Sequence, residues 1–156
     1  MKKNILFKGQ SMFEVVFALG IIALITIAIV SVSTVAIRNN VVSKNKSLSN
    51  KYLNEMNEWL RAERDKSFPT VYGHGSPGGS QYCLVDIGSG WSGAHPHACG
   101  DSDFMVDNPV FIRGFTLTTF TIAGSQKGIN SEAYVRWSDA QGMHESRSNT
   151  VYSSWD

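Results

Sequence analysis

The hydrophobic pattern of the chain changes near Ile37. From Met12 to Ile37 nearly every side chain is apolar, and Glu14 is the only ionisable residue. A helix that is apolar on all sides has to be buried in lipid or among other helices. The run also exceeds the roughly 20 residues that a helix needs to cross the bilayer core. The pattern therefore predicts a helix that is inserted in a membrane.

From Arg38 to Lys66 the chain has no proline or glycine, and its apolar residues recur every three or four positions. This spacing places the following residues on one stripe of an amphipathic helix: Leu48, Tyr52, Met56 and Trp59 or Leu60. The polar residues on the other side are Asn50, Asn54, Glu58 and Arg61. The simplest prediction is one continuous helix from about Ser11 to Lys66, ended by Ser67-Phe68-Pro69. Its second half needs a partner surface from the rest of the chain.

Residues 71–107 are rich in glycine and are expected to form loops. Residues 81–87 are the one plausible strand in this region. We expect Cys83 and Cys99 to form a disulfide, because two cysteines outside the cytoplasm most simply pair with each other. Closing this loop stabilises the fold by about 3 kcal/mol in the chain-entropy model. We also expect Trp91 to pack the loop onto the sheet.

Residues 109–122 have the composition of a strand, rich in threonine, phenylalanine and isoleucine. Alternation places one set of apolar residues on one face: Phe111, Phe115 and Leu117. Phe120 and Ile122 fall on the other face, and a bulge or a strong twist near Thr118 would reconcile the two sets.

A turn at 124–128 leads to the next predicted strand, whose inward residues are Ala133, Val135 and Trp137 and whose outward residues are Tyr134 and Arg136. Residues 139–142 are expected to form a hairpin turn with Gly142 in the left-handed position. Residues 143–152 are more polar and are expected to form an edge strand, anchored by Trp155. Together these elements predict an α+β fold in which a long N-terminal helix packs on a three- to four-stranded antiparallel sheet.

Composition and charge add little to this predicted fold and exclude few classes of function. The 156 residues carry a net charge of +1, and 17% of them are charged, which does not indicate a broad nucleic-acid-binding face. After the membrane helix about a hundred residues remain, enough for one small domain.

Catalytic motifs are not recognisable in the sequence. The glycine runs at 73–75 and 78–79 lack the Lys-Ser/Thr of a phosphate-binding loop. The sequence does not contain the strand-turn-helix setting of a serine nucleophile. We expect His74 to be solvated. The prediction is a protein that is not an enzyme and has no cofactor.

Two metal sites are alternatives to this interpretation. Tetrahedral zinc uses the ligand types of His95, His97, Cys83 and Cys99, but their spacing is irregular and a disulfide competes for both thiols. Calcium could use residues 101–103, Asp-Ser-Asp, but the loop lacks further carboxylates. We therefore expect the disulfide and no metal site.

The segment before the apolar run is short and basic. It contains Lys2, Lys3 and Lys8 and has no apolar core of its own. In an ordinary secretory signal the hydrophobic region comes before the small residue at the cleavage site, whereas here Gly9 comes before the hydrophobic region. Cleavage after Gly9 would leave the helix on the mature protein and create an amino group at Gln10, one helical turn from Glu14.

This order of Lys8-Gly9, a short segment, Glu14 and an uninterrupted apolar helix resembles the class III signal of type IV pilins and type II secretion pseudopilins. The resemblance covers about the first forty residues. It implies that a prepilin peptidase cuts between Gly9 and Gln10 and that the new terminus is N-methylated. It also implies that Glu14 pairs with the amino terminus of a neighbouring subunit during assembly.

Two positions depart from the family pattern. Gln10 replaces the usual phenylalanine, and Ser31 lies in a region where many major pilins have a proline. An N-terminal glutamine can also cyclise and lose its charge. We expect Gln10 to remain a charged amine, because Glu14 needs a partner. The strand and turn at 135–139 and the closing Trp155 are similar to the end of minor pilins.

The resemblance implies four segments: a cleaved leader (1–9), a membrane and filament-core half of the helix (10–37), an amphipathic half (38–66) and a head (67–156). We expect a minor pilin or pseudopilin, located in the cytoplasmic membrane with the head outside and then in a filament. Its partners would be other pilin subunits, the prepilin peptidase and the assembly platform. One alternative is a single-pass membrane-anchored binding or adhesion protein that does not assemble. Another is a minor pilin that captures DNA.

Overall fold

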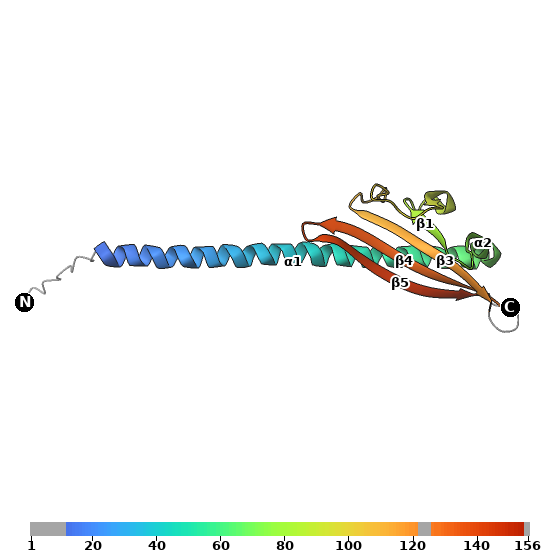
Figure 1. The fold of residues 1–156 in the computed structure, drawn as a ribbon, viewed down its shortest axis with the longest axis horizontal. Coiled ribbons are helices and arrows are strands. Elements are labelled where there is room, and N and C mark those ends of the chain that lie inside the picture. Colours follow the sequence, from blue (N-terminus) through green and yellow to red (C-terminus); the bar gives the residue numbers. More distant parts are fainter. Residues whose placement is uncertain (1–11, 122–125, 155–156) are drawn as a thin grey trace, which may run out of the picture. The chain divides into compact units, whose positions relative to one another are not determined.

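The computed structural model describes residues 12–121 and 126–154 and has an α+β architecture. The chain divides into two units between Ser43 and Lys44. The helical elements are α1 (Met12–Lys66), α2 (Phe68–His74) and the 3-10 helix η1 (Gly90–Gly93). The strands are β1 (Ser80–Leu84), β2 (Ala94–His95), β3 (Phe111–Thr121), β4 (Lys127–Asp139) and β5 (Gly142–Ser153) (Figure 1).

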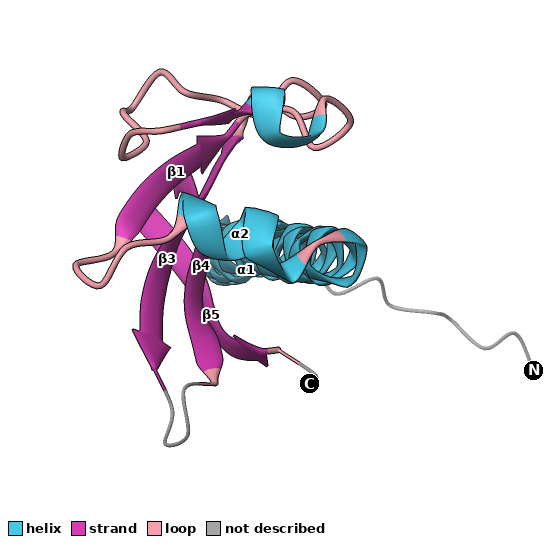
Figure 2. Cartoon of the chain, turned by 90° about the vertical axis from the view of Figure 1, so that its right-hand side faces the viewer, coloured by secondary structure: helices cyan, strands magenta, loops and turns pink. Residues whose placement is uncertain are grey.

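The sheet of the second unit is antiparallel, with strand order β2-β1-β3-β4-β5. The C-terminal half of α1 lies against one face of this sheet (Figure 2). The predicted helix-on-sheet α+β fold is therefore confirmed, and β5 is an edge strand as expected. The sheet has five strands instead of three or four, because the two residues of β2 also pair with β1.

The predicted helix stripe forms one side of the core. Tyr52, Met56 and Leu60 are buried, whereas the polar residues predicted for the other side are exposed. The sheet supplies the opposing apolar side chains: Tyr82, Leu84, Phe111, Phe115, Leu117, Ile129, Ala133, Val135, Trp137 and Tyr152. The helix and the sheet bury apolar surface against each other, which is the dominant favourable contribution to folding.

The ladder between β3 and β4 is regular from the pair Phe111–Trp137 to the pair Thr121–Lys127. Of the two predicted features near Thr118, a bulge or a strong twist, the ladder excludes the bulge. Phe120 lies on the face of the sheet opposite α1. It pairs with Gly128, whose missing side chain leaves room for the Phe120 ring on that face. Gly128 belongs to β4 and not to the predicted turn, and residues 122–125 lie outside the described part of the chain.

The hairpin between β4 and β5 turns at residues 139–142, as predicted. Gly142 has a φ of 121°, a conformation that other residues rarely adopt. The Asp139 carboxylate accepts a hydrogen bond from the backbone N–H of Gln141 at 2.8 Å. Trp155, which we expected to anchor this strand, lies outside the described residues.

Two elements between residues 67 and 95 differ from the prediction. The sequence Ser67-Phe68-Pro69 ends α1 but also starts α2, whose residues 71–74 lie in a region predicted to be a loop. The Ser67 hydroxyl accepts a hydrogen bond from the N–H of Thr70, and proline is favourable in a first helical turn. The strand predicted at 81–87 ends at Leu84, because Asp86 begins a turn by accepting a hydrogen bond from the N–H of Gly88.

Candidate functional sites: the apolar helix and the disulfide-bonded loop

The N-terminal half of α1 exposes apolar side chains on every side. All described residues up to Val41 are exposed, including Phe13, Ile22 and Ile37. At about 1.5 Å per residue, the segment from Val15 to Ile37 is about 35 Å long, which exceeds the roughly 30 Å of a bilayer core. The part of the chain that the structure describes thus contains one helix that is long and apolar enough to cross a membrane.

The few hydroxyl groups in this segment are satisfied inside the helix. Thr26 donates to the carbonyl of Ile22 at 2.8 Å, and Thr34 donates to the carbonyl of Val30 at 2.9 Å. Ser31 and Ser33 make equivalent bonds one turn back. A hydroxyl bonded in this way can enter a water-free environment at low cost.

Glu14 lies in the first turn of α1 and is exposed. A carboxylate is favourable at a helix N-terminus, where backbone N–H groups carry partial positive charge. The predicted cleavage residues Gly9 and Gln10 lie outside the described residues.

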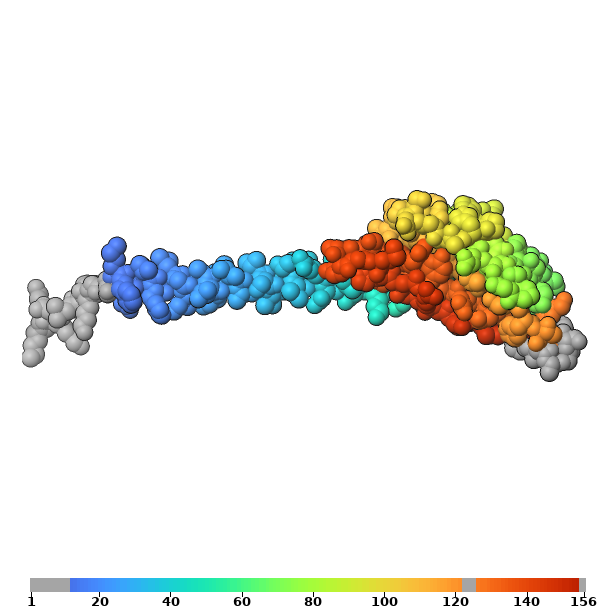
Figure 3. All heavy atoms as spheres, viewed as in Figure 1, coloured from blue at the N-terminus to red at the C-terminus, as the bar shows by residue number. Residues whose placement is uncertain are grey.

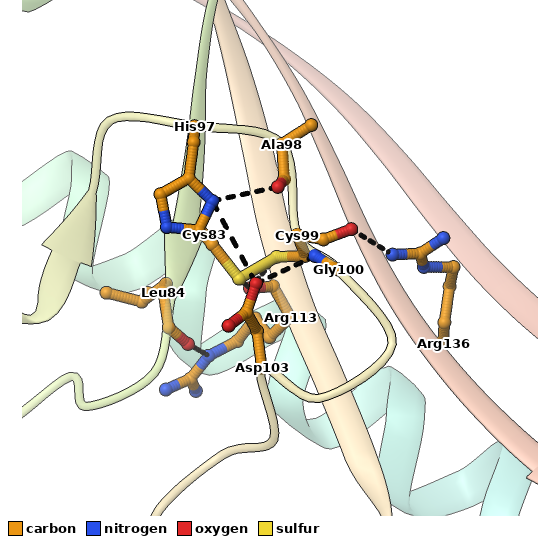
Figure 4. Close-up of a disulfide and its surroundings, with 9 residues drawn as sticks. All are labelled: Cys83, Leu84, His97, Ala98, Cys99, Gly100, Asp103, Arg113 and Arg136. Atoms are coloured by element: carbon orange, nitrogen blue, oxygen red, sulfur yellow. Dashed lines mark hydrogen bonds and ion pairs between the residues drawn. A yellow bond between two sulfur atoms is a disulfide. The ribbon is translucent and has the colours of Figure 1, made fainter.

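The disulfide between Cys83 and Cys99 is present and joins β1 to the loop before β3 (Figure 4). It packs with Ile112 and Tyr134 on the face of the sheet opposite α1. Gly114 of β3 lies directly beneath it: a Cβ atom at this residue would lie 2.9 Å from Cys99 Sγ and 2.6 Å from Tyr134 Oη. The close packing of the disulfide on β3 therefore requires glycine at this position.

The disulfide uses both thiols of the zinc alternative. Both sulfur atoms are bonded to each other, so the zinc set with His95 and His97 is not assembled. His97 Nδ1 lies 2.8 Å from the carbonyl of Ala98, and Asp103 accepts a hydrogen bond from the N–H of Gly100 at 2.7 Å (Figure 4). Within residues 12–121 and 126–154, histidine, cysteine and acidic side chains do not form a group of three that could hold a metal.

Trp91 packs the disulfide-bonded loop onto the domain, as predicted. Its ring lies 5.1 Å from that of Trp59 and 6.3 Å from that of Phe115, measured between centroids. Its Nε1 donates to the Glu63 carboxylate at 2.9 Å. A loop residue is thus fixed to both α1 and β3.

His74 is only partly exposed to solvent, whereas we expected it to be solvated. Its ring stacks on Trp91 with a centroid distance of 3.8 Å, and its carbonyl accepts a hydrogen bond from Tyr82 Oη at 2.8 Å. This partial burial lowers the pKa of His74 below its ordinary value of 6.5. The position in a glycine-rich stretch gave no sign of this, because the contact depends on Trp91, which is distant in sequence.

Arg113 is a buried charge that the sequence analysis did not single out. It belongs to the inward face of β3 and is 1% exposed. Its Nε donates to the carbonyl of Leu84 at 3.4 Å (Figure 4), whereas Nη1 and Nη2 lack a hydrogen-bond partner among the described residues. Burial lowers the pKa of Arg113, and the negative charges of Glu55 and Asp107 oppose this shift. Alternation with Phe111 and Phe115 was the available signal for its inward position.

Comparisons of the chain with protein-family models, with curated proteins and with solved structures find no match.

Proposed function

We propose that this protein is a structural subunit, a minor pilin or pseudopilin, of a type IV pilus-like filament or a secretion pseudopilus. In this proposal a prepilin peptidase removes residues 1–9, and the mature chain waits in the cytoplasmic membrane with its head outside. An assembly platform then moves the subunit into the filament. The observation that carries the proposal is the contrast within α1, whose first half is apolar and exposed and whose second half is covered by the sheet.

An apolar helix that leaves a membrane has to be shielded from water both before and after it leaves. Lipid covers it before assembly, and the same apolar side chains of neighbouring subunits cover it afterwards. Dispersion contacts between closely packed helices then offset the loss of lipid contacts. The internally bonded hydroxyls of Thr26 and Thr34 suit either environment.

Glu14 gives the assembled helices a register. A carboxylate deep in a membrane costs about 2–3 kcal/mol, so its presence in an otherwise apolar segment needs a compensating interaction. In the proposal this partner is the amino group of Gln10 on a neighbouring subunit. Such a pair penalises a shifted alignment of two helices more than it adds to their affinity.

Processing is the first test. The protein is expressed with and without a prepilin peptidase, and its N-terminus is determined by mass spectrometry. The proposal predicts a mature chain that begins at Gln10 with a free or methylated amine. A chain that keeps Met1 in the presence of the peptidase would support the alternative of a simple membrane anchor. A pyroglutamate at Gln10 would remove the charge partner of Glu14 and contradict the pairing.

Assembly is the second test. Glu14→Ala and Glu14→Gln should leave cleavage unchanged but reduce the amount of the protein in sheared surface filaments by about tenfold or more, because a buried charge loses its partner. Glu58→Gln is the matched control, since Glu58 is an exposed glutamate on the amphipathic half of α1. Undiminished filaments with either Glu14 variant would contradict the register role.

A further inference from the structure

The face of the sheet opposite α1 carries a row of polar side chains that crosses four strands. The strand register places Gln81 of β1 beside Thr116 of β3, Thr116 beside Glu132 of β4, and Glu132 beside Asn149 of β5. Directly paired residues point to the same face of a sheet. With strands about 4.8 Å apart, the row is about 14 Å long.

This row lies in a shallow hollow of about 530 Å³ that is open to solvent. Strands β4 and β5, which form one side of it, are drawn in orange and red at the surface of the head in Figure 3. Among the described residues, Gln81, Thr116, Glu132 and Asn149 do not use their side chains for hydrogen bonds within the protein. Their amide, hydroxyl and carboxylate groups are therefore free to bind a ligand that offers both donors and acceptors.

An aromatic ring borders the polar row. Tyr134 lies two residues from Glu132 on the same face of β4 and also lines the hollow. Its hydroxyl end rests on Gly114, and the Arg136 guanidinium lies 5.2 Å from its ring centroid. Arg136 is itself held by a hydrogen bond of 2.8 Å from its Nη2 to the carbonyl of Cys99. The ring is thus fixed in place beside the row by Gly114 and Arg136, and only part of it is exposed to the hollow.

The charges of the hollow indicate what kind of ligand fits. Glu132 and Glu145 contribute two negative charges, and Arg136 and Arg147 contribute two positive charges. Glu145 and Arg147 pair with each other. A polyanion such as a nucleic acid needs a surplus of positive charge, which this surface lacks.

We propose that this hollow binds a neutral oligosaccharide along the row from Gln81 to Asn149. Sugar hydroxyls both donate and accept hydrogen bonds, which matches the free amide and carboxylate groups of the row. The part of the Tyr134 ring that lines the hollow adds an apolar contact for the carbon atoms of a sugar ring at one end of the row. This binding does not depend on filament assembly, so its test and the tests of assembly can fail separately.

The test uses the full chain in micelles with phosphocholine headgroups, because detergents with sugar headgroups would compete. Maltoheptaose, cellopentaose and chitotetraose are titrated by calorimetry, with a single-stranded oligonucleotide as the charged comparator. We expect saturable binding of at least one neutral sugar. Asn149→Ala and Gln81→Ala should each weaken it about fivefold, the effect of one lost hydrogen bond.

Asn54→Ala is the matched control, because Asn54 is an exposed amide on α1, which packs against the opposite face of the sheet. This variant should bind with unchanged affinity. Absence of saturable binding for all three sugars would overturn the inference. Equal weakening by Asn54→Ala, or displacement of the sugar by the oligonucleotide, would also overturn it.

Discussion

Replacing the buried Arg113 with methionine should stabilise the head. Methionine is unbranched, flexible and free of polar nitrogen atoms, and although it is shorter than arginine it can fill most of the same space without an unpartnered charge. The structure leaves Nη1 and Nη2 of Arg113 without hydrogen-bond partners among the described residues. Truncated ion pairs are destabilising in protein interiors, whereas apolar replacements of buried charges are often stabilising.

The magnitude follows from the groups involved. Each buried nitrogen without a partner costs about 1–3 kcal/mol. Two interactions offset part of this cost. The first is the hydrogen bond from Nε to the carbonyl of Leu84, whose length of 3.4 Å indicates a weak bond. The second is the attraction between the guanidinium and the carboxylates of Glu55 and Asp107. We expect Arg113→Met to raise the free energy of unfolding by about 1–3 kcal/mol, which is a rise in Tm of at least about 4 °C for a domain of this size.

The assay is thermal unfolding of the full chain in micelles, followed by near-ultraviolet circular dichroism of the aromatic side chains in the head. Arg61→Met is the control, because Arg61 is exposed and its pair with Glu58 spans one helical turn at the surface. Its effect should stay within about 0.5 kcal/mol. If Arg113→Met instead lowers the stability by more than about 1 kcal/mol, the guanidinium has effective partners in solution and the reasoning is wrong.

Two further predictions concern the other face of the head and its aromatic cluster. Gly114→Ala should destabilise the head by about 1–3 kcal/mol in denaturant titrations, because the new methyl group meets Tyr134 and Cys99, whereas Gly78→Ala meets open space and should be near neutral. Burial lowers the pKa of His74, so the folded state binds fewer protons than the unfolded state as the pH falls below 6.5. Stability should therefore fall between about pH 7 and about pH 5 by more in the wild type than in His74→Gln, and equal slopes in the two proteins would refute this.

Local patterns in the sequence were sufficient for the elements whose signals lie close together in the chain. The helix from Met12 to Lys66 follows from a run of apolar residues and then a spacing of three and four. The hairpin around Gly142 follows from a turn sequence between alternating strands. The disulfide was predicted because the chain has two cysteines and one pairing.

Other features were decided by tertiary contacts. His74 is partly buried because Trp91 reaches it across the loop, and β2 exists because β1 offers it an edge. The polar row from Gln81 to Asn149 is assembled by strand register, which aligns four residues that are far apart in the chain. Neighbouring residues in the sequence were enough to predict the long helix, the three long strands and the apolar side of each, but not α2 or β2. Only the packed sheet determined which polar and aromatic groups meet, because such meetings depend on the registers of strands that pair over long distances in the sequence.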